Sequence, residues 1–275
     1  MTDWAFLSAT DLAARIRRGA ITSVAITDYF IDRIERLDGD VNAVVVRTFE
    51  AARAAAVIAD AAAAEGRWLG PLHGVPMTIK ESYVLAGTVP TWGLERFRHN
   101  QSKHDGLIVQ RFKAAGAHFL GKTNVPVDLA DFQSYNPLYG ATGNPWDVTR
   151  TPGGSSGGSA AALAAGFSAL EAGSDIGGSI RNPAHFCGVY GHKPTYGVVP
   201  MQGHELVSGL PEGDLSVCGP MARSAGDLSL ALSIMAGPGQ RLGKGWQLAL
   251  KPAVKQALSD FKVVVWATDD PAPVS

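Results

Sequence analysis

Cysteine is scarce in this sequence, with Cys187 and Cys218 the only two among 275 residues. Two cysteines cannot build the disulfide framework of a small secreted protein, so we expect two free thiols in a reducing cytosol. Long apolar runs are also lacking, and none approaches the ~18 residues of a membrane span. Residues 1–19 show no basic segment followed by an apolar one, so they predict no signal peptide. We therefore expect a soluble, cytoplasmic protein without a membrane partner.

The sequence also lacks an excess of either charge. It has 24 lysine and arginine residues against 25 aspartate and glutamate residues, a formal net charge of −1. Such a chain has no strong field to attract nucleic acid, so we expect no nucleic-acid partner. The seven histidines show neither H-x-H nor H-E-x-x-H spacing, so we expect no metal site, and no motif implies a cofactor.

Short buried runs alternate with segments of helical periodicity. Strands are predicted over 42–48, 74–82, 117–124, 217–224 and 261–267, and helices over 8–18, 23–38, 49–66, 105–116, 159–166 and 225–237, with Ser8 and Ser224 as N-caps. This alternation is typical of α/β proteins, here with a mixed twisted β-sheet core covered by helices on both faces. The continuous apolar residues of 261–267 indicate a strand buried on both faces.

A glycine- and serine-rich segment, GGSSGGSAAALAAG at 153–166, leads directly into a helix of small residues. It lacks the lysine of a phosphate-binding Walker loop, and no strand precedes it as in a dinucleotide fingerprint. It matches G-x-S-x-G, but Pro152 stands where the strand of a hydrolase elbow should end. A flexible linker would not continue as a helix, nor would it explain a second cluster, GSDIGGSIR at 173–181.

Together the two clusters resemble the amidase signature family. The segments that carry the resemblance are GPLHGVPMTIKES (70–82), LGKTNVP (120–126), YNPLYGATGNPWDVTRTPGG (135–154), PGGSSGGSAAALAAG (152–166) and GSDIGGSIRNPAHFCGVYGHKPTYG (173–197), so the signature core is about 60–230. The resemblance implies the amidase signature fold for residues 1–275 as a single domain. Because family members are considerably longer, we expect these residues to be the N-terminal portion of a longer domain, with the C-terminal part missing.

The resemblance also implies a Ser–cis-Ser–Lys site. Ser179 is then the nucleophile, Ser155 the bridging serine after a cis peptide bond, and Lys80 the base. A lysine acts as a base near neutral pH only when burial lowers its pKa. The apolar run VPMTIK, residues 75–80, would supply that burial.

The same resemblance assigns roles around these three residues. Backbone N–H groups of Ile176, Gly177, Gly178 and the nucleophile itself are expected to form the oxyanion hole. Residues expected to hold the two loops in place are Ser156, Asp175 and Arg181. Residues expected to line the acyl side of the substrate are Leu129, Ala130 and Asp131. Cys187 lies in an apolar setting, where thiols are usually inert.

The expected function is hydrolysis of a small carboxamide to an acid and ammonia through a serine acyl-enzyme. One alternative is the glutaminase subunit of a tRNA-dependent amidotransferase, and another is a non-catalytic scaffold with the same fold. The intact set of Lys80, Ser155 and Ser179 argues against the scaffold. The expected partner is a small-molecule amide, and a homodimer is also expected as one way to cover the apolar residues 261–267.

Overall fold

The computed structural model of the protein describes residues 4–207, 213–239, 241–251, 254 and 257–264. Among these residues, two three-stranded sheets have the strand orders β1-β3-β2 and β6-β8-β7, and β4 and β5 form a small hairpin. The strands are β1 (Val44–Arg47), β2 (Pro76–Lys80), β3 (His118–Thr123), β4 (Tyr135–Asn136), β5 (Gly140–Ala141), β6 (Leu170–Asp175), β7 (Tyr190–Gly191) and β8 (Val217–Ala222).

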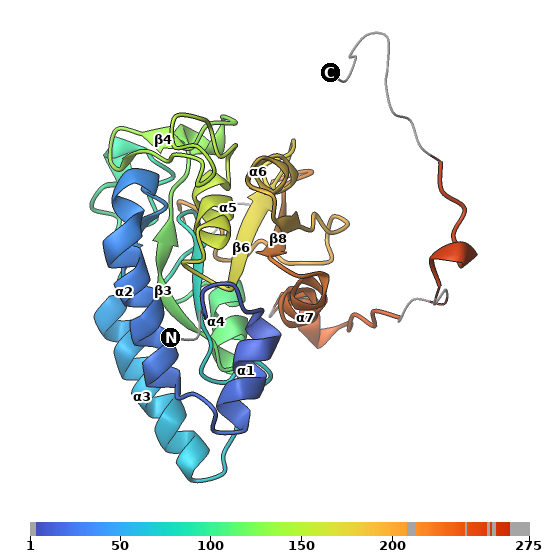
Figure 1. Ribbon diagram of the computed structural model, residues 1–275. Helices are drawn as coiled ribbons and strands as arrows, with labels where there is room; N and C mark the ends of the chain where they lie inside the picture. Colours follow the sequence, from blue (N-terminus) through green and yellow to red (C-terminus); the bar gives the residue numbers. More distant parts are fainter. Residues whose placement is uncertain (1–3, 208–212, 240, 252–253, 255–256, 265–275) are drawn as a thin grey trace.

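The two sheets lie next to each other because β2 and β6 are side by side (Figure 1). β2 runs parallel to β3, and β1 runs antiparallel to β3. In the other sheet, β8 is antiparallel to both β6 and β7. The expected mixed α/β architecture is therefore confirmed. β2 and β6 are buried at every position, and each carries residues of the expected site.

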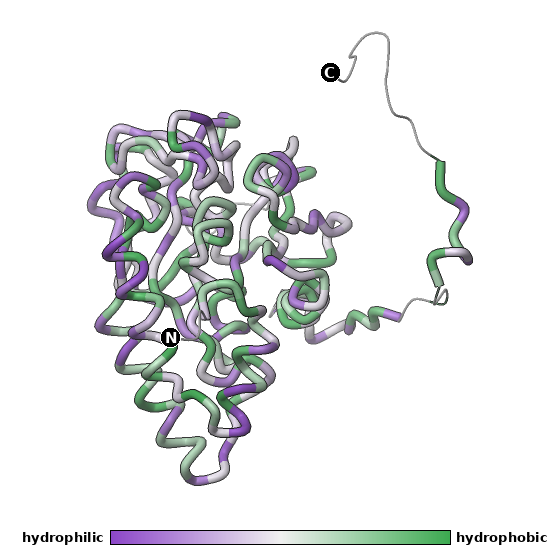
Figure 2. Tube along the Cα trace, in the orientation of Figure 1, coloured by the Kyte–Doolittle hydropathy of each residue, from purple (hydrophilic) through white to green (hydrophobic). Residues whose placement is uncertain are grey.

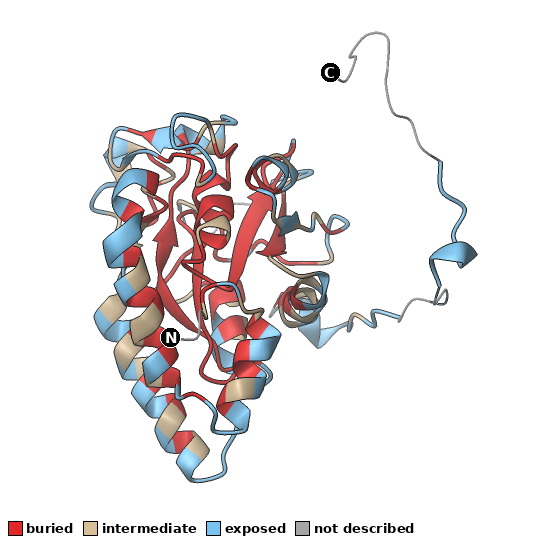
Figure 3. Cartoon of the chain, viewed as in Figure 1, coloured by how far each residue is buried: buried red, intermediate tan, exposed pale blue. Residues whose placement is uncertain are grey.

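Seven α-helices occur in the described residues: α1 (Ala9–Arg17), α2 (Ser23–Val41), α3 (Phe49–Ala64), α4 (Leu107–Ala114), α5 (Gly157–Ala164), α6 (Arg181–Cys187) and α7 (Ala225–Met235). α2 and α3 lie side by side along the β1-β3-β2 sheet, whereas α5 packs on β2 and β6, and α7 packs on β8 (Figure 1). Hydrophilic and hydrophobic residues alternate along α2 and α3 (Figure 2), and the strands between the helices are buried (Figure 3).

The caps predicted for two helices are confirmed. Ser8 Oγ accepts the backbone N–H of Asp11 at 3.0 Å, and Ser224 Oγ accepts that of Asp227 at 3.0 Å. Each bond satisfies one of the N–H groups that have no partner within the first turn of a helix. None of the helices in the described part of the chain has both the length and the apolar character needed to span a membrane.

Two parts of the secondary structure differ from the sequence prediction. Some elements were not predicted: β6, which ends within the second glycine–serine cluster, α6, which begins at the last residue of that cluster, and the two-residue strands β4, β5 and β7. The strand predicted over 261–267 is wrong for its described residues: Phe261–Val264 are not in a strand, and Val263 and Val264 are 73% and 84% exposed. Strand backbone must pair with a neighbouring strand, and no described strand lies beside these residues. Residues 265–267 lie outside the described residues.

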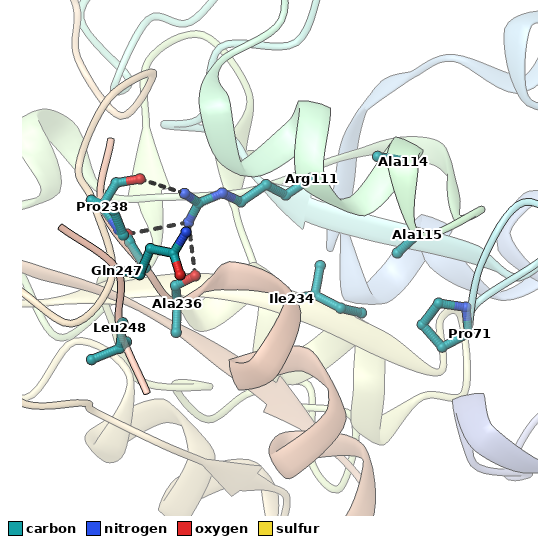
Figure 4. A pocket seen from close by; sticks show the side chains of 10 residues that line it. Pro71, Arg111, Ala114, Ala115, Ile234, Ala236, Pro238, Gln247 and Leu248 are labelled. Atoms are coloured by element: carbon teal, nitrogen blue, oxygen red, sulfur yellow. Dashed lines mark hydrogen bonds between the residues drawn. The ribbon is translucent and has the colours of Figure 1, made fainter. Parts of the chain in front are cut away.

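Arg111 connects α4 to the end of α7 (Figure 4). Its guanidinium donates to the carbonyl oxygens of Ala236 at 3.2 Å and Pro238 at 2.7 Å, and also to that of Met235. Carbonyl groups in the last turn of a helix have no partners within the helix, so a cation there is favourable. This contact fixes the end of α7 beside α4.

The helix α5 packs unusually closely against the chain that follows β3. A Cβ atom added at Gly158 would stand 2.3 Å from the backbone nitrogen of Asn124. Only glycine therefore allows the two backbones to approach, and this approach sets the position of the turn that carries Ser155.

We expect Gly158→Ala to destabilise the protein by about 1–3 kcal/mol, although alanine normally favours a helix, because the added methyl has no space. The matched control is Gly39→Ala in α2, where an added Cβ meets no atom within 4 Å. We expect this control to stabilise the protein by up to about 1 kcal/mol. Urea unfolding of both variants measures the two signs, and a stabilising Gly158→Ala would contradict the packing described.

Candidate active site

Lys80 ends β2 and is fully buried. Its Nζ donates to Ser155 Oγ at 2.7 Å and to Ser174 Oγ at 2.9 Å. Burial removes water from the ammonium group and lowers the pKa of Lys80 to about 7, and the nearby acidic groups oppose this shift only in part. Near neutral pH the amine is therefore available as a base in a large fraction of molecules.

Ser155 lies in the turn that leads into α5 and is 1% exposed. The peptide bond between Gly154 and Ser155 is cis, the geometry expected from the sequence. Glycine precedes the serine for a steric reason, since a Cβ at 154 would stand 2.4 Å from the carbonyl oxygen of Asp131. The turn is thus pressed against the loop that contains Asp131.

Ser179 and Ser155 line the same cavity, which has a volume of about 790 Å³. The two glycine–serine clusters are joined directly, because the backbone N–H of Ser156 donates to the carbonyl oxygen of Ser179 at 3.0 Å. Ser156 Oγ donates to the carbonyl oxygen of Ser174 at 3.3 Å. The structure therefore brings Ser155 and Ser179 to one cavity, and the buried Lys80 lies directly behind Ser155. Ser156 holds the two clusters together.

Asp175 organises the loop that carries Ser179. Its carboxylate accepts the backbone N–H groups of Gly178 at 2.8 Å and Ile180 at 3.0 Å, and Arg181 Nη2 donates to it at 2.9 Å. Burial would raise the pKa of Asp175, but the hydrogen bond from Arg181 and those from the backbone outweigh it and lower this pKa to about 2. The loop is therefore wrapped around a fixed negative charge.

The expected oxyanion donors are not equivalent. The N–H of Gly178 is engaged by Asp175, so it is turned to the carboxylate and not to the cavity, in contrast to the expectation from sequence. Gly178 has φ +130°, which a residue with a side chain rarely adopts. Ile176 lines the cavity, and a Cβ added at Gly177 would meet no atom within 4 Å. Ile176, Gly177 and Ser179 remain as candidate N–H donors.

Two of the three residues expected on the acyl side of the substrate line the cavity. Leu129 and Ala130 line the cavity, but Asp131 is exposed and is not among the residues that line it. The neighbouring Asp128 lines the cavity in its place, together with Trp92. The exposed carboxylate of Asp131 is used locally instead, where Oδ1 accepts the N–H of Gln133 at 3.2 Å.

Sequence reasoning missed several side chains at this cavity, and three of them contact other residues of the site. Ser174 shares Lys80 Nζ with Ser155, and Trp92 and His204 form part of the cavity wall. Burial, and then the nearby charge of Lys80, lowers the pKa of His204 to about 3, so its ring is neutral. Only for Ser174 did the sequence hold a signal, since it belongs to the quoted cluster and precedes Ser179 on a buried strand.

Cys187 is fully buried, and burial raises the pKa of its thiol to about 12. Its Sγ lies 3.4 Å from the carbonyl oxygen of Pro152, behind the first cluster. A thiol in this state is a poor nucleophile. The described residues contain no group of three or more histidine, cysteine, aspartate or glutamate side chains placed to hold a metal ion.

Comparison with known proteins gives consistent matches along the chain. The family model described as Amidase matches residues 25–275. A glutamyl-tRNA(Gln) amidotransferase subunit from Thioalkalivibrio sulfidiphilus is 42% identical over 228 residues, which is 82% of this chain and 46% of that protein. A putative amidase AmiB2 from Mycobacterium tuberculosis is 43% identical over 231 residues, 84% of this chain and 49% of that protein.

Solved structures give the same result. A peptide amidase from Stenotrophomonas maltophilia aligns with TM-score 0.80 at 31% identity, over 89% of this chain and 51% of that one. A fatty acid amide hydrolase aligns with TM-score 0.79 at 33% identity, over 83% of this chain and 40% of that one. The chain spans about half the length of the curated relatives it matches.

The buried Asp175 carboxylate should make the protein less stable to unfolding at low pH. Its pKa is about 2 in the folded protein against an ordinary value of 3.8, so its stabilising effect is complete above about pH 4 and is lost as the pH falls toward 2. We expect this effect to be on the order of 2 kcal/mol, and to be missing in Asp175→Asn. Urea unfolding between pH 6 and about pH 3 measures about half of this loss, on the order of 1 kcal/mol.

The control for this measurement is Asp131→Asn, which changes an exposed aspartate on the adjoining loop. This variant should keep the wild-type dependence on pH. If wild type and Asp175→Asn lose stability in parallel as the pH falls, the charge of Asp175 does not hold the loop.

Proposed function

The chain belongs to the amidase family, and on this premise we propose that it hydrolyses the C–N bond of a small carboxamide to a carboxylic acid and ammonia. The observation that carries the proposal is the 2.7 Å hydrogen bond from the buried Lys80 Nζ to Ser155 Oγ, at a cavity also lined by Ser179. This geometry offers a base, a hydroxyl relay and a nucleophile at one place.

In the proposed mechanism, neutral Lys80 takes the proton of Ser155, and Ser155 takes that of Ser179. A hydroxyl both donates and accepts, so Ser155 passes the proton without a net change. Ser179 Oγ then bonds to the amide carbon, and the carbonyl oxygen becomes an oxyanion. The proton returns from Lys80 through Ser155 to the nitrogen, the C–N bond breaks and ammonia leaves. Water attacks the resulting ester by the same route in reverse and releases the acid.

The tetrahedral oxyanion needs hydrogen-bond donors that are already in position. We propose the backbone N–H groups of Ile176, Gly177 and Ser179 for this role, since that of Gly178 is engaged by Asp175. Arg181 and Asp175 then keep the loop in shape, and Ser156 keeps it against the first cluster. Leu129 and Ala130 would contact the acyl group of the substrate.

A second candidate is a glutaminase that supplies ammonia to a partner protein. The observation in its favour is a sequence identity of 42% to two relatives named as subunits of glutamyl-tRNA(Gln) amidotransferase. Similar identity to a putative amidase, and structural likeness to a peptide amidase, favour hydrolysis of a free amide instead. The two candidates share the reaction at Ser179 and differ in the amide that reaches it.

We also propose that residues 60–230 form the core of one domain within 1–275. One continuous cluster of buried apolar side chains runs from Ala9 in α1 to Met235 in α7, which supports a single unit. The expectations of a longer domain, a cytoplasmic location and a homodimer stay predictions from the sequence.

We expect Ser179 to carry the acyl group. A serine-directed fluorophosphonate should therefore label Ser179 in the full chain, and peptide mass spectrometry detects the labelled residue. A substrate competes for the same hydroxyl, so preincubation with it should slow the labelling. We expect protection, with ammonia release, from one of the aliphatic, aryl or arylacetic amides, whereas protection by glutamine alone would support the glutaminase.

The variant Ser179→Ala should not be labelled. The matched control is Ser156→Ala, which changes a serine that joins the two clusters, and this variant should still be labelled at Ser179. Labelling of Ser155 or Cys187 in place of Ser179 would contradict the proposed mechanism.

A further inference from the structure

Lys80, the last residue of β2, and the two residues after it are fully buried, and their side chains contact different residues of the cavity wall. Lys80 contacts Ser155 and Ser174. Ser82 Oγ lies 2.8 Å from His204 Nε2, in the cavity wall. Glu81, between them, has no part in the proposed proton transfer, although a buried carboxylate is costly unless its hydrogen bonds are satisfied.

Glu81 is satisfied almost entirely by one turn of the chain. Its Oε1 accepts the backbone N–H of Thr91 at 2.7 Å and the Thr91 hydroxyl at 2.8 Å, and its Oε2 accepts the backbone N–H of Trp92 at 3.0 Å. The buried ammonium group of Lys122 lies 4.0 Å from Oε1 and balances the charge. The backbone N–H groups of residues 91 and 92 therefore donate to this carboxylate, whereas in a helix or strand they would donate to backbone carbonyl groups.

The turn that Glu81 holds has an unfavourable backbone conformation and forms cavity wall. Trp92 has φ +51° and lines the cavity. Its carbonyl oxygen accepts the N–H of Asp128 at 2.7 Å, and Asp128 and Leu129 are themselves at φ +55° and +57°. Residues with side chains adopt such values only where their surroundings impose them.

The Trp92 ring is also held from the same strand end. Its Nε1 donates to the carbonyl oxygen of Ser82 at 3.3 Å, and its ring centroid lies 5.4 Å from that of His204. The position of this ring therefore depends on the Glu81 contacts for its backbone and on the Ser82 contacts for its side chain.

We propose that Glu81 is a positioning residue that fixes the Trp92 wall of the cavity and thereby determines which acyl groups reach Ser179. This inference rests on the proposed function, because it concerns the substrate of that same serine. When the carboxylate is lost, the N–H groups of Thr91 and Trp92 lose their acceptors. The turn then relaxes out of the left-handed region, and the ring leaves the wall.

The test compares the rates at which two fluorophosphonates, one with a small and one with a bulky alkyl chain, label Ser179. In Glu81→Gln we expect the small reagent to react at a rate within about threefold of wild type, since the chemistry is intact. The ratio of bulky to small rates should change by about tenfold or more, because small displacements of a positioning group have effects of this size. Glu95→Gln, an exposed glutamate in the nearby 3-10 helix Glu95–Phe97, is the matched control and should keep the wild-type ratio.

Two further variants keep the test decisive if Glu81→Gln does not fold. Thr91→Val removes one hydrogen bond to Glu81 and leaves the Lys122 pair in place, so it should shift the ratio in the same direction. Trp92→Gly suits the positive φ and removes the ring, so it should reproduce the full shift, and adding Glu81→Gln to it should change nothing more.

The possible results separate this inference from the proposed function. If Glu81→Gln keeps the wild-type ratio while Ser179 is still labelled, the role of Glu81 is overturned and the proposed function stands. If Glu81→Gln does not fold, an unchanged ratio in Thr91→Val gives the same conclusion. A fall in the rates of both reagents with an unchanged ratio places Glu81 with the chemistry and also overturns the inference. Absence of Ser179 labelling in wild type overturns the proposed function and the inference with it.

Discussion

A lysine that loses its water on burial must find polar partners, and it loses part of its affinity for the proton as well. Lys80 does both, because its Nζ contacts Ser155 and Ser174 while its pKa falls to about 7. The rest of the site depends on keeping this group buried in that position. β2 supplies the burial, β6 at its side supplies Ser174, and the turn before α5 supplies Ser155.

Close approach of backbones is the second constraint, and it explains the small residues of the two clusters. A Cβ at Gly154 would strike the loop that follows Leu129, and one at Gly173 would stand 2.8 Å from Ser156 Oγ. The clusters are therefore packed on each other and on the loop that contains Asp131, with no space for larger side chains. The same closeness lets Asp175 and Glu81, two buried carboxylates, fix loops that lack regular pairing.

The elements and residues that depend on local pattern could be predicted from the sequence. Ser8 and Ser224 are N-caps whose hydrogen bonds lie within one turn of the helix, so the local sequence predicts them. The clusters around Ser155 and Ser179 are recognisable as continuous sequence motifs. What could not be predicted depends on contacts between distant segments. Trp92 is held at the cavity by contacts with Glu81 and Ser82, and the N–H of Gly178 donates to Asp175. A cavity wall built from such contacts has no signature in the sequence.

The central claim is that Lys80 is neutral in a large fraction of molecules at neutral pH. The direct measurement is an NMR titration of lysine side chains in the full chain labelled with ¹³C at Cε, with the Lys80 signal assigned by its loss in Lys80→Arg. We expect a midpoint close to 7, because burial disfavours the charged form, so the amine is protonated below that pH and neutral above it. A midpoint near the ordinary value of 10.5 would contradict the account, since the buried lysine would then be a fixed cation and not a base.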